Sequence, residues 1–257
     1  MNPEDFQNFR KNLKDNLNQL ETVTGLAFVG SAADTSRADE WSDHDFFVFT
    51  TDGNAEGLRQ DLTWLPDYED IVLFVRETEH GLKVIYNDGH VLEFAIFEDD
   101  WELSGVNLFE VTLDKSSIAE RMAEAQARSV PKPIDLDREF SLFLAHLLIG
   151  TGRFRRGETL SARQFINTFC VNSVVRLVTE LIPPSTDSRD TADNQNPFRR
   201  FEVRYPEMSN ELEAIQRKDL ESAALELLGF VKRNLAGHLK QQQIAQIAVI
   251  EDRLGWQ

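Results

Sequence analysis

The sequence predicts an α+β protein, in which an N-terminal mixed sheet with helices is followed by an all-α helical bundle. Short apolar runs separated by turn residues fill the first half of the chain and are typical of strands. In the second half, the apolar residues recur at helical spacing instead. Two prolines in SVPKPIDLD (129–137) mark the change, so we expect one domain over residues 1–130 and a second over residues 131–257.

The first half is predicted to alternate helices with strands. Helical segments are expected over residues 4–20, within the polar stretch 31–42, and over residues 56–65. Apolar runs indicate strands over residues 24–30, 43–50, 70–77, 81–88 and 90–98. Asn87-Asp88-Gly89 favours a tight turn, so the last two strands are expected to form a hairpin.

The second half is predicted to be helical. Apolar stripes place helices around residues 140–148 and 165–182, and two further helical regions cover residues 209–236 and 240–254. The polar, turn-rich segment 183–197 is expected to be a loop. The apolar stripes fit either an internal core or the interface of a homodimer, so a homodimer is one of two alternatives.

Composition narrows the function classes. The 257 residues include 44 acidic and 27 basic ones, giving a formal net charge of −17. Such a surface repels phosphate backbones, so we expect no nucleic-acid partner. It would attract a cationic small molecule, although acidity that only maintains solubility is the simpler interpretation. With one cysteine, Cys170, no apolar stretch of about 18 residues and no signal sequence, we expect a cytoplasmic protein without a membrane partner.

Two aspartates stand at the start of a strand that is otherwise apolar. Asp43 and Asp45 are two residues apart, so they point to the same face as Phe47 and Phe49. Two carboxylates at the edge of an apolar face are unfavourable unless a cation compensates them. Their hard oxygen ligands favour Mg²⁺ or Mn²⁺. An Asp-x-Asp pair alone is common at strand ends, so only the residues around it can indicate whether it binds a metal ion.

Three further residues supply that context. Gly30 and Ser31 follow a strand where a helix begins, and backbone N–H groups at such a point attract phosphate. Taken alone, Gly-Ser is an ordinary turn. Glu93 is the one charged residue inside the apolar strand HVLEFAIF, which makes it the candidate third carboxylate. Its alternative is an outward-facing position on an edge strand.

Together these motifs resemble the nucleotidyltransferase superfamily typified by DNA polymerase β. The chain has FVGS, an eleven-residue spacer, DHDFFVF, and later LEFAIF. Its size and order look closest to bacterial lincosamide and aminoglycoside nucleotidyltransferases, which carry a C-terminal helical bundle. The segments IGTGRFRRGETLSARQFI (149–166) and NPFRRFEVRYPE (196–207) are similar to stretches of that bundle. Many members have Asp as the third carboxylate where this chain has Glu93, and some use Glu there as catalytic base.

The resemblance implies a metal-dependent enzyme of the EC 2.7.7 type that moves AMP from ATP onto a hydroxyl of a small molecule and releases pyrophosphate. An aminoglycoside- or lincosamide-like antibiotic is one candidate acceptor. Asp43, Asp45 and Glu93 would be catalytic and hold the metal, with Glu93 as ligand or base. The triphosphate would be bound by Gly30, Ser31, Arg156 and Arg200. The alternatives are a protein acceptor, or a nucleotide- or partner-binding module without activity.

Overall fold

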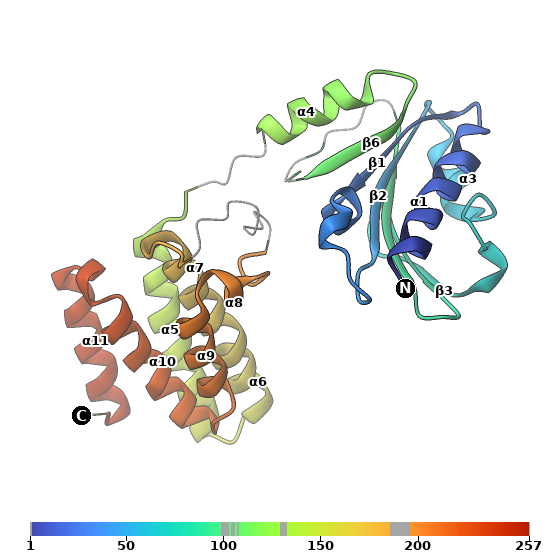
Figure 1. Ribbon diagram of the computed structural model, residues 1–257. Helices are drawn as coiled ribbons and strands as arrows, with labels where there is room; N and C mark the ends of the chain where they lie inside the picture. Colours follow the sequence, from blue (N-terminus) through green and yellow to red (C-terminus); the bar gives the residue numbers. More distant parts are fainter. Residues whose placement is uncertain are drawn as a thin grey trace. The chain divides into compact units, whose positions relative to one another are not determined.

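The structure is a computed structural model that describes residues 2–98, 103, 106, 108–128, 133–185 and 196–256. The chain divides into two compact units, Met1–Val130 and Pro131–Gln257 (Figure 1). The first unit contains a mixed sheet with helices, and the second is helical. The predicted α+β class is therefore confirmed. None of the described helices is both long and apolar enough to cross a membrane.

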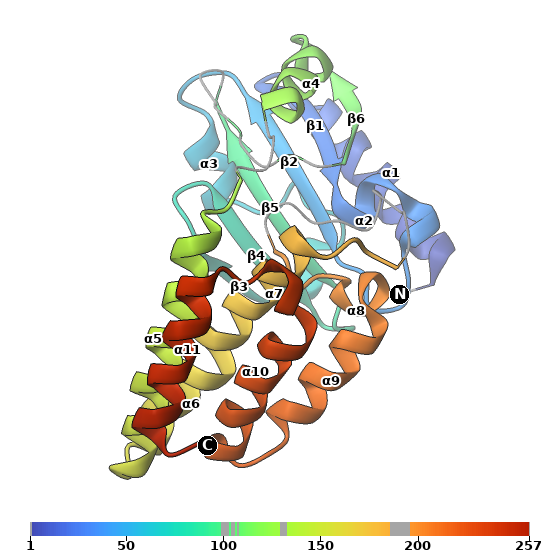
Figure 2. The same ribbon diagram turned by 90° about the vertical axis from the view of Figure 1, so that its left-hand side faces the viewer.

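A six-stranded sheet in the order β3-β4-β5-β2-β1-β6 forms the centre of the first unit. Its strands are β1 (Val23–Val29), β2 (His44–Thr50), β3 (Ile71–Arg76), β4 (Gly81–Tyr86), β5 (Val91–Phe97) and β6 (Phe109–Asp114). β2 and β5 run parallel, and the other neighbouring pairs are antiparallel. The sheet is therefore mixed, as predicted, and β2 lies next to β5 near its middle (Figure 2).

The two faces of the sheet carry separate cores. On one face, apolar residues of helix α1 (Pro3–Asn18) pack with alternate residues of the strands. Phe6, Phe9, Leu13 and Leu17 of this helix are buried, and the helix ends at Asn18, two residues before the end of the predicted segment 4–20. On the other face, helix α4 (Ile118–Arg128) buries its own apolar residues against Ala27 and Phe49. β1 is buried along both faces, which explains why it is so apolar, whereas residues of β4 and β5 alternate between buried and partly exposed.

Several first-half elements differ in extent from the prediction. The hairpin of β4 and β5 forms as expected, with Gly89 at a φ of +86° in its turn. Helix α3 spans only Ala55–Gln60, because the Asp61 side chain accepts a hydrogen bond from the N–H of Thr63 and starts a turn. Residues 31–42 form two short helices, α2 (Gly30–Ala33) and η1 (Thr35–Arg37), with loop after them. Strand β6 and helix α4 were not predicted.

The second unit is built from helices around one apolar core. They are α5 (Leu136–Arg155), α6 (Thr159–Arg163), the π-helical η3 (Gln164–Cys170), α7 (Val171–Leu181), α8 (Phe201–Arg204), α9 (Pro206–Gln216), α10 (Leu220–Asn234), η5 (Ala236–His238) and α11 (Gln241–Leu254). Figure 2 shows α5, α9, α10 and α11 running alongside one another. The helical region predicted over 209–236 consists of two helices, α9 and α10, and Asp219 caps the start of α10 by accepting a hydrogen bond from the N–H of Ser222. Most of the loop predicted over 183–197 lies outside the described residues.

Candidate metal centre

Strand β2 brings Asp45 to the open side of the sheet and His44 to the core. Asp43 comes directly before the strand, and the burial of its residues alternates from His44 onward. His44 is fully buried, whereas Asp45 is partly exposed on the same face as Phe47. The alternation that the sequence predicted therefore places the carboxylates and the histidine on opposite faces.

Strand β5 supplies the third carboxylate. Asp45 is the register partner of Glu93 across the parallel pair of β2 and β5. One carboxylate oxygen from each of Asp43, Asp45 and Glu93 lies within 4.8 Å of the others, and all three residues are partly buried. The three carboxylates predicted from the sequence thus meet in one cluster. Glu93 lies on an inner strand, so its edge-strand alternative is wrong.

The cluster suits a divalent ion of the magnesium type. It offers only carboxylate oxygens, which are the hard ligands that Mg²⁺ and Mn²⁺ prefer. Ligands about 2.1 Å from an octahedral Mg²⁺ lie at most about 4.2 Å apart, so the oxygens are already close to ligand spacing. Three carboxylates this near each other repel, and a bound cation removes that repulsion.

Gly30 provides the space in which Asp45 sits. Its φ is +59°, a left-handed conformation that favours glycine, and a Cβ there would lie 3.0 Å from Oδ2 of Asp45. Ser31 follows it in α2, which begins at Gly30 but is only four residues long. A single turn has only a small helix dipole. The requirement for glycine next to a carboxylate of the cluster is the stronger observation.

Lys83 is a charged residue of this site that the sequence analysis missed. It lies on β4 opposite Glu93, and its Nζ is 2.9 Å from Oε1 of Glu93 and 3.2 Å from Oε2 of Glu77. These carboxylates, Glu93 first, raise the pKa of Lys83 above its ordinary value. The sequence did carry a signal, because Lys83 is the one charge in its strand and faces the one charge in the next.

Beneath the carboxylates, His44 and His90 form a buried pair. Nε2 of His44 lies 3.1 Å from the carbonyl oxygen of Phe6, which can only accept, so this nitrogen carries the proton. Nδ1 of His44 therefore accepts from Nε2–H of His90, at 2.7 Å. Burial lowers the pKa of His44 to about 3 and that of His90 to about 4. Both rings are thus neutral core groups.

The two arginines predicted to bind triphosphate belong to the second unit. Arg156 follows α5, and its Nε donates to Oε1 of Glu158 at 2.8 Å around Gly157. Arg200 precedes α8 with a φ of +59°. The Arg156 contact is an ion-paired turn between two helices, and neither arginine is in the unit that holds the carboxylates.

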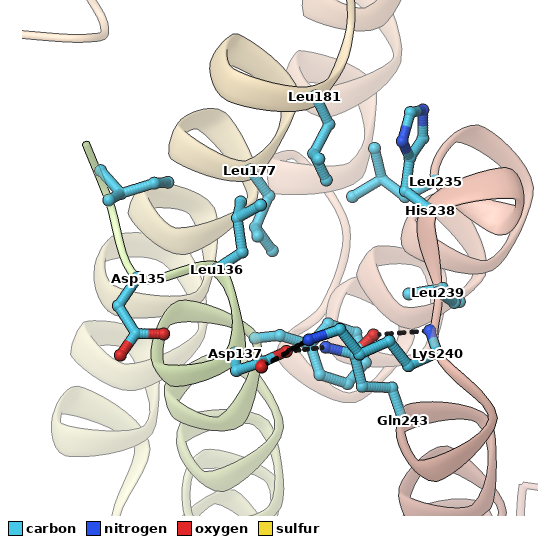
Figure 3. Close-up of a pocket in the computed structure, with 12 residues that line it drawn as sticks. Asp135, Leu136, Asp137, Leu177, Leu181, Leu235, His238, Leu239, Lys240 and Gln243 are labelled. Atoms are coloured by element: carbon cyan, nitrogen blue, oxygen red, sulfur yellow. Dashed lines mark hydrogen bonds and ion pairs between the residues drawn. The ribbon is translucent and has the colours of Figure 1, made fainter.

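The second unit contains a pocket of about 320 Å³ (Figure 3). Apolar residues make up most of its lining, together with several polar ones: Ile134, Asp135, Leu136, Asp137, Phe140, Leu177, Leu181, Leu235, His238, Leu239, Lys240 and Gln243. Asp137 accepts hydrogen bonds at Oδ1 from Lys240, at 2.7 Å, and from Gln243, at 3.2 Å. A volume of this size is within the usual range for small-molecule sites.

Comparison with solved structures finds neighbours that span the chain. An aminoglycoside 6-adenyltransferase from Bacillus subtilis matches with 13% identity and a TM-score of 0.35, over 96% of this chain and 97% of that one. The STING-associated CdnE c-di-GMP synthase from Capnocytophaga granulosa matches with 13% identity and a TM-score of 0.29, over 99% of this chain and 80% of that one.

No protein-family model and no curated protein matches the chain. Because both structural neighbours are only 13% identical, with TM-scores below 0.5, the assignment of a function depends on the geometry of the site itself. The two neighbours therefore add no argument to the resemblance that the Gly-Ser and Asp-x-Asp motifs carry.

Proposed function

We propose that the chain is a metal-dependent nucleotidyltransferase that transfers AMP from ATP to a hydroxyl group of a small molecule. The observation that carries this proposal is the cluster of Asp43, Asp45 and Glu93, whose carboxylate oxygens lie within 4.8 Å of one another beside Gly30. These residues come from separate parts of the sequence and meet on the open side of one sheet. Oxygen-only ligand sets of this kind bind Mg²⁺ together with phosphates.

Each residue of the cluster has a role that follows from its place. Asp43 and Asp45 would hold the ion at the start of β2, and Gly30 leaves room for Asp45 and for a close approach of phosphate oxygens. The Ser31 hydroxyl and the backbone N–H groups beside it donate hydrogen bonds to the triphosphate. A divalent ion at this site would neutralise the triphosphate charge, orient the α-phosphate and stabilise the leaving oxygens.

The transfer itself needs a deprotonated acceptor. The acceptor oxygen forms a bond to the α-phosphorus while the bond to the bridging oxygen breaks, and pyrophosphate leaves. Glu93 either takes the proton of the acceptor hydroxyl onto a carboxylate oxygen or binds a second ion. A positioned base of this type contributes roughly 10²- to 10⁴-fold to the rate.

The helical unit is proposed to recognise the acceptor. Its pocket is lined by apolar side chains, which suit a hydrophobic portion of the molecule, and by the Asp135 carboxylate, which suits a cationic or hydroxylated portion. An antibiotic with a sugar hydroxyl is one acceptor of this chemistry. With one cysteine, Cys170, which is buried and free, the reducing cytoplasm is the proposed compartment.

The intact carboxylate cluster favours an enzyme over a binding module that has lost catalysis. Such a module would be expected to lack one of Asp43, Asp45 and Glu93, or to hold them apart, and here they meet. A protein as acceptor is the second candidate reaction, which the chain's net charge of −17 neither favours nor opposes.

Pyrophosphate release tests the proposed reaction. Wild-type protein is incubated with ATP, Mg²⁺ and a panel of aminoglycosides, lincosamides and other hydroxylated amines, with Asp45→Asn as the control. We expect release that depends on one acceptor class and is lost in the variant. Release that is equal in wild type and variant, or transfer of labelled AMP to the protein fraction alone, would contradict a small-molecule transferase.

A further inference from the structure

One row of side chains crosses the sheet at the level of the carboxylate cluster. The strand registers pair Val75 with Lys83, Lys83 with Glu93, Glu93 with Asp45, and Asp45 with Val29. Register partners share a face, and partners that lie directly opposite have Cβ atoms about 4.5–5.5 Å apart. The sheet therefore fixes the base of the Lys83 side chain beside Glu93, independently of how its ammonium group moves.

The ammonium group of Lys83 lies between two carboxylates. Its Nζ is 2.9 Å from Oε1 of Glu93 and 3.2 Å from Oε2 of Glu77, which follows β3. The side chains of Lys83, Glu77 and Glu93 are 36%, 55% and 43% exposed. Ion pairs this exposed contribute little to folding stability. Folding alone therefore does not account for a lysine next to a carboxylate that is grouped with Asp43 and Asp45.

We propose that Lys83 is a positioning residue that competes with divalent metal for Glu93, an inference that rests on the function proposed above. Lys83 occupies Oε1 of Glu93 and adds a positive charge beside the cluster. An ion that uses Glu93 must therefore displace Lys83 or bind against its charge. An ion held by Asp43 and Asp45 is favoured over one that also uses Glu93.

Glu77 weakens the hold of Lys83 on Glu93, because the Lys83 ammonium group pairs with both carboxylates. Removing the charge of Lys83 is expected to strengthen metal binding about fivefold, since a unit charge several ångströms from a divalent ion has an effect of this size in water. Removing the charge of Glu77 leaves Lys83 to Glu93 alone and is expected to weaken metal binding by a similar factor.

Mn²⁺ binding to the full chain without nucleotide tests the inference independently of catalysis. Titration calorimetry at low ionic strength compares wild type with Lys83→Met, Glu77→Gln, their double variant and Asp45→Asn. Lys218→Met is the matched control, because Lys218 is an exposed lysine that also pairs with one carboxylate, Glu226, in the other unit. Circular dichroism confirms that each variant is folded.

The expected result is tighter Mn²⁺ binding in Lys83→Met, weaker binding in Glu77→Gln and no change in Lys218→Met. If Glu77 acts through Lys83, the Glu77→Gln effect shrinks in the Lys83→Met background. Unchanged or weaker binding in Lys83→Met, with binding still lost in Asp45→Asn, overturns the role of Lys83 and leaves the proposed function intact. Absence of Mn²⁺ binding in wild type overturns both.

Discussion

Asp45 and Glu93 are register partners on the parallel strands β2 and β5, 48 positions apart in the sequence. This pairing, rather than the Asp-x-Asp spacing alone, creates the candidate metal centre. An Asp-x-Asp pair at a strand end offers two carboxylates, and a parallel neighbour is needed to add a third on the same face. The partly exposed face that carries them is separated by the sheet from the core around His44.

Gly30→Ala is predicted to weaken the site by displacing Asp45. The new Cβ would lie 3.0 Å from Oδ2 of Asp45, and the neighbouring carboxylate would have to rotate away from the cluster. Changes in groups that orient a metal ligand typically weaken metal affinity roughly 10- to 100-fold. Mn²⁺ titration and pyrophosphate release both measure this loss.

Gly53→Ala is the matched control for this prediction. Gly53 also has a positive φ, +79°, but a Cβ there would meet nothing within 4 Å. Both variants therefore place alanine in a left-handed conformation, which destabilises the fold by about 1–2 kcal/mol. Only Gly30→Ala should lose metal affinity; an equal loss in both variants would show that backbone strain, rather than contact with Asp45, is responsible.

Folding stability is predicted to fall as the pH drops below about 6.5. In the unfolded chain His44 and His90 take up protons near their ordinary pKa of 6.5, but burial lowers their folded pKa values to about 3 and about 4. The unfolded state therefore binds more protons, and each histidine removes up to about 1.4 kcal/mol of stability per pH unit in this range. Urea unfolding at pH 7.5 and pH 5.0 should show a difference of roughly 2–4 kcal/mol.

Two variants assign this pH dependence to the histidine pair. His90→Gln removes one titrating group and keeps a donor for Nδ1 of His44, so the difference between the two pH values should shrink by about half. His238→Gln removes an exposed histidine of the second unit and should leave the difference unchanged. Equal stability of the wild type at both pH values would contradict the neutral, buried state of the pair.

Leu181→Trp is predicted to impair acceptor binding without affecting ATP. Leu181 lines the pocket of the second unit, and a larger side chain would fill part of its roughly 320 Å³. If the pocket holds an apolar portion of the acceptor, the acceptor KM should rise about tenfold or more, because pocket fit contributes factors of that size. Leu225→Trp, at a residue 42% exposed on α10, is the control. Equal acceptor KM values in both variants would contradict a role of the pocket in binding the acceptor.

The sequence predicted the carboxylates well because their signals are local. Asp43 and Asp45 interrupt an apolar alternation, and Glu93 is the one charge in its strand, so each stands out without knowledge of the fold. Lys83 was predictable as well. In a hairpin whose turn is centred on Asp88, residues at equal distances before and after Asp88 face each other. Lys83 and Glu93 are each five positions from Asp88, so they lie opposite each other, as the structure shows.

Other features depend on contacts that the local sequence does not carry. The parallel pairing of β2 with β5 depends on how α3, β3 and β4 fold between them, and no local pattern specifies it. Strand β6, with the sequence FEVTLD, has residues of mixed polarity, so its apolar signal is weak. The division of the helical region 209–236 was marked by a local cap, Asp219, that apolar spacing alone overlooks.

Magnesium-dependent ATP binding is the most direct test of the carboxylate cluster as the nucleotide-metal site. Calorimetric titration of ATP into wild type, Asp45→Asn and Asp43→Asn, each with Mg²⁺ and with EDTA, separates metal-dependent binding from any other. The cluster predicts that wild type binds ATP only with Mg²⁺ and that either variant loses this binding while remaining folded. ATP binding that is the same with EDTA, or that survives in both variants, would contradict it.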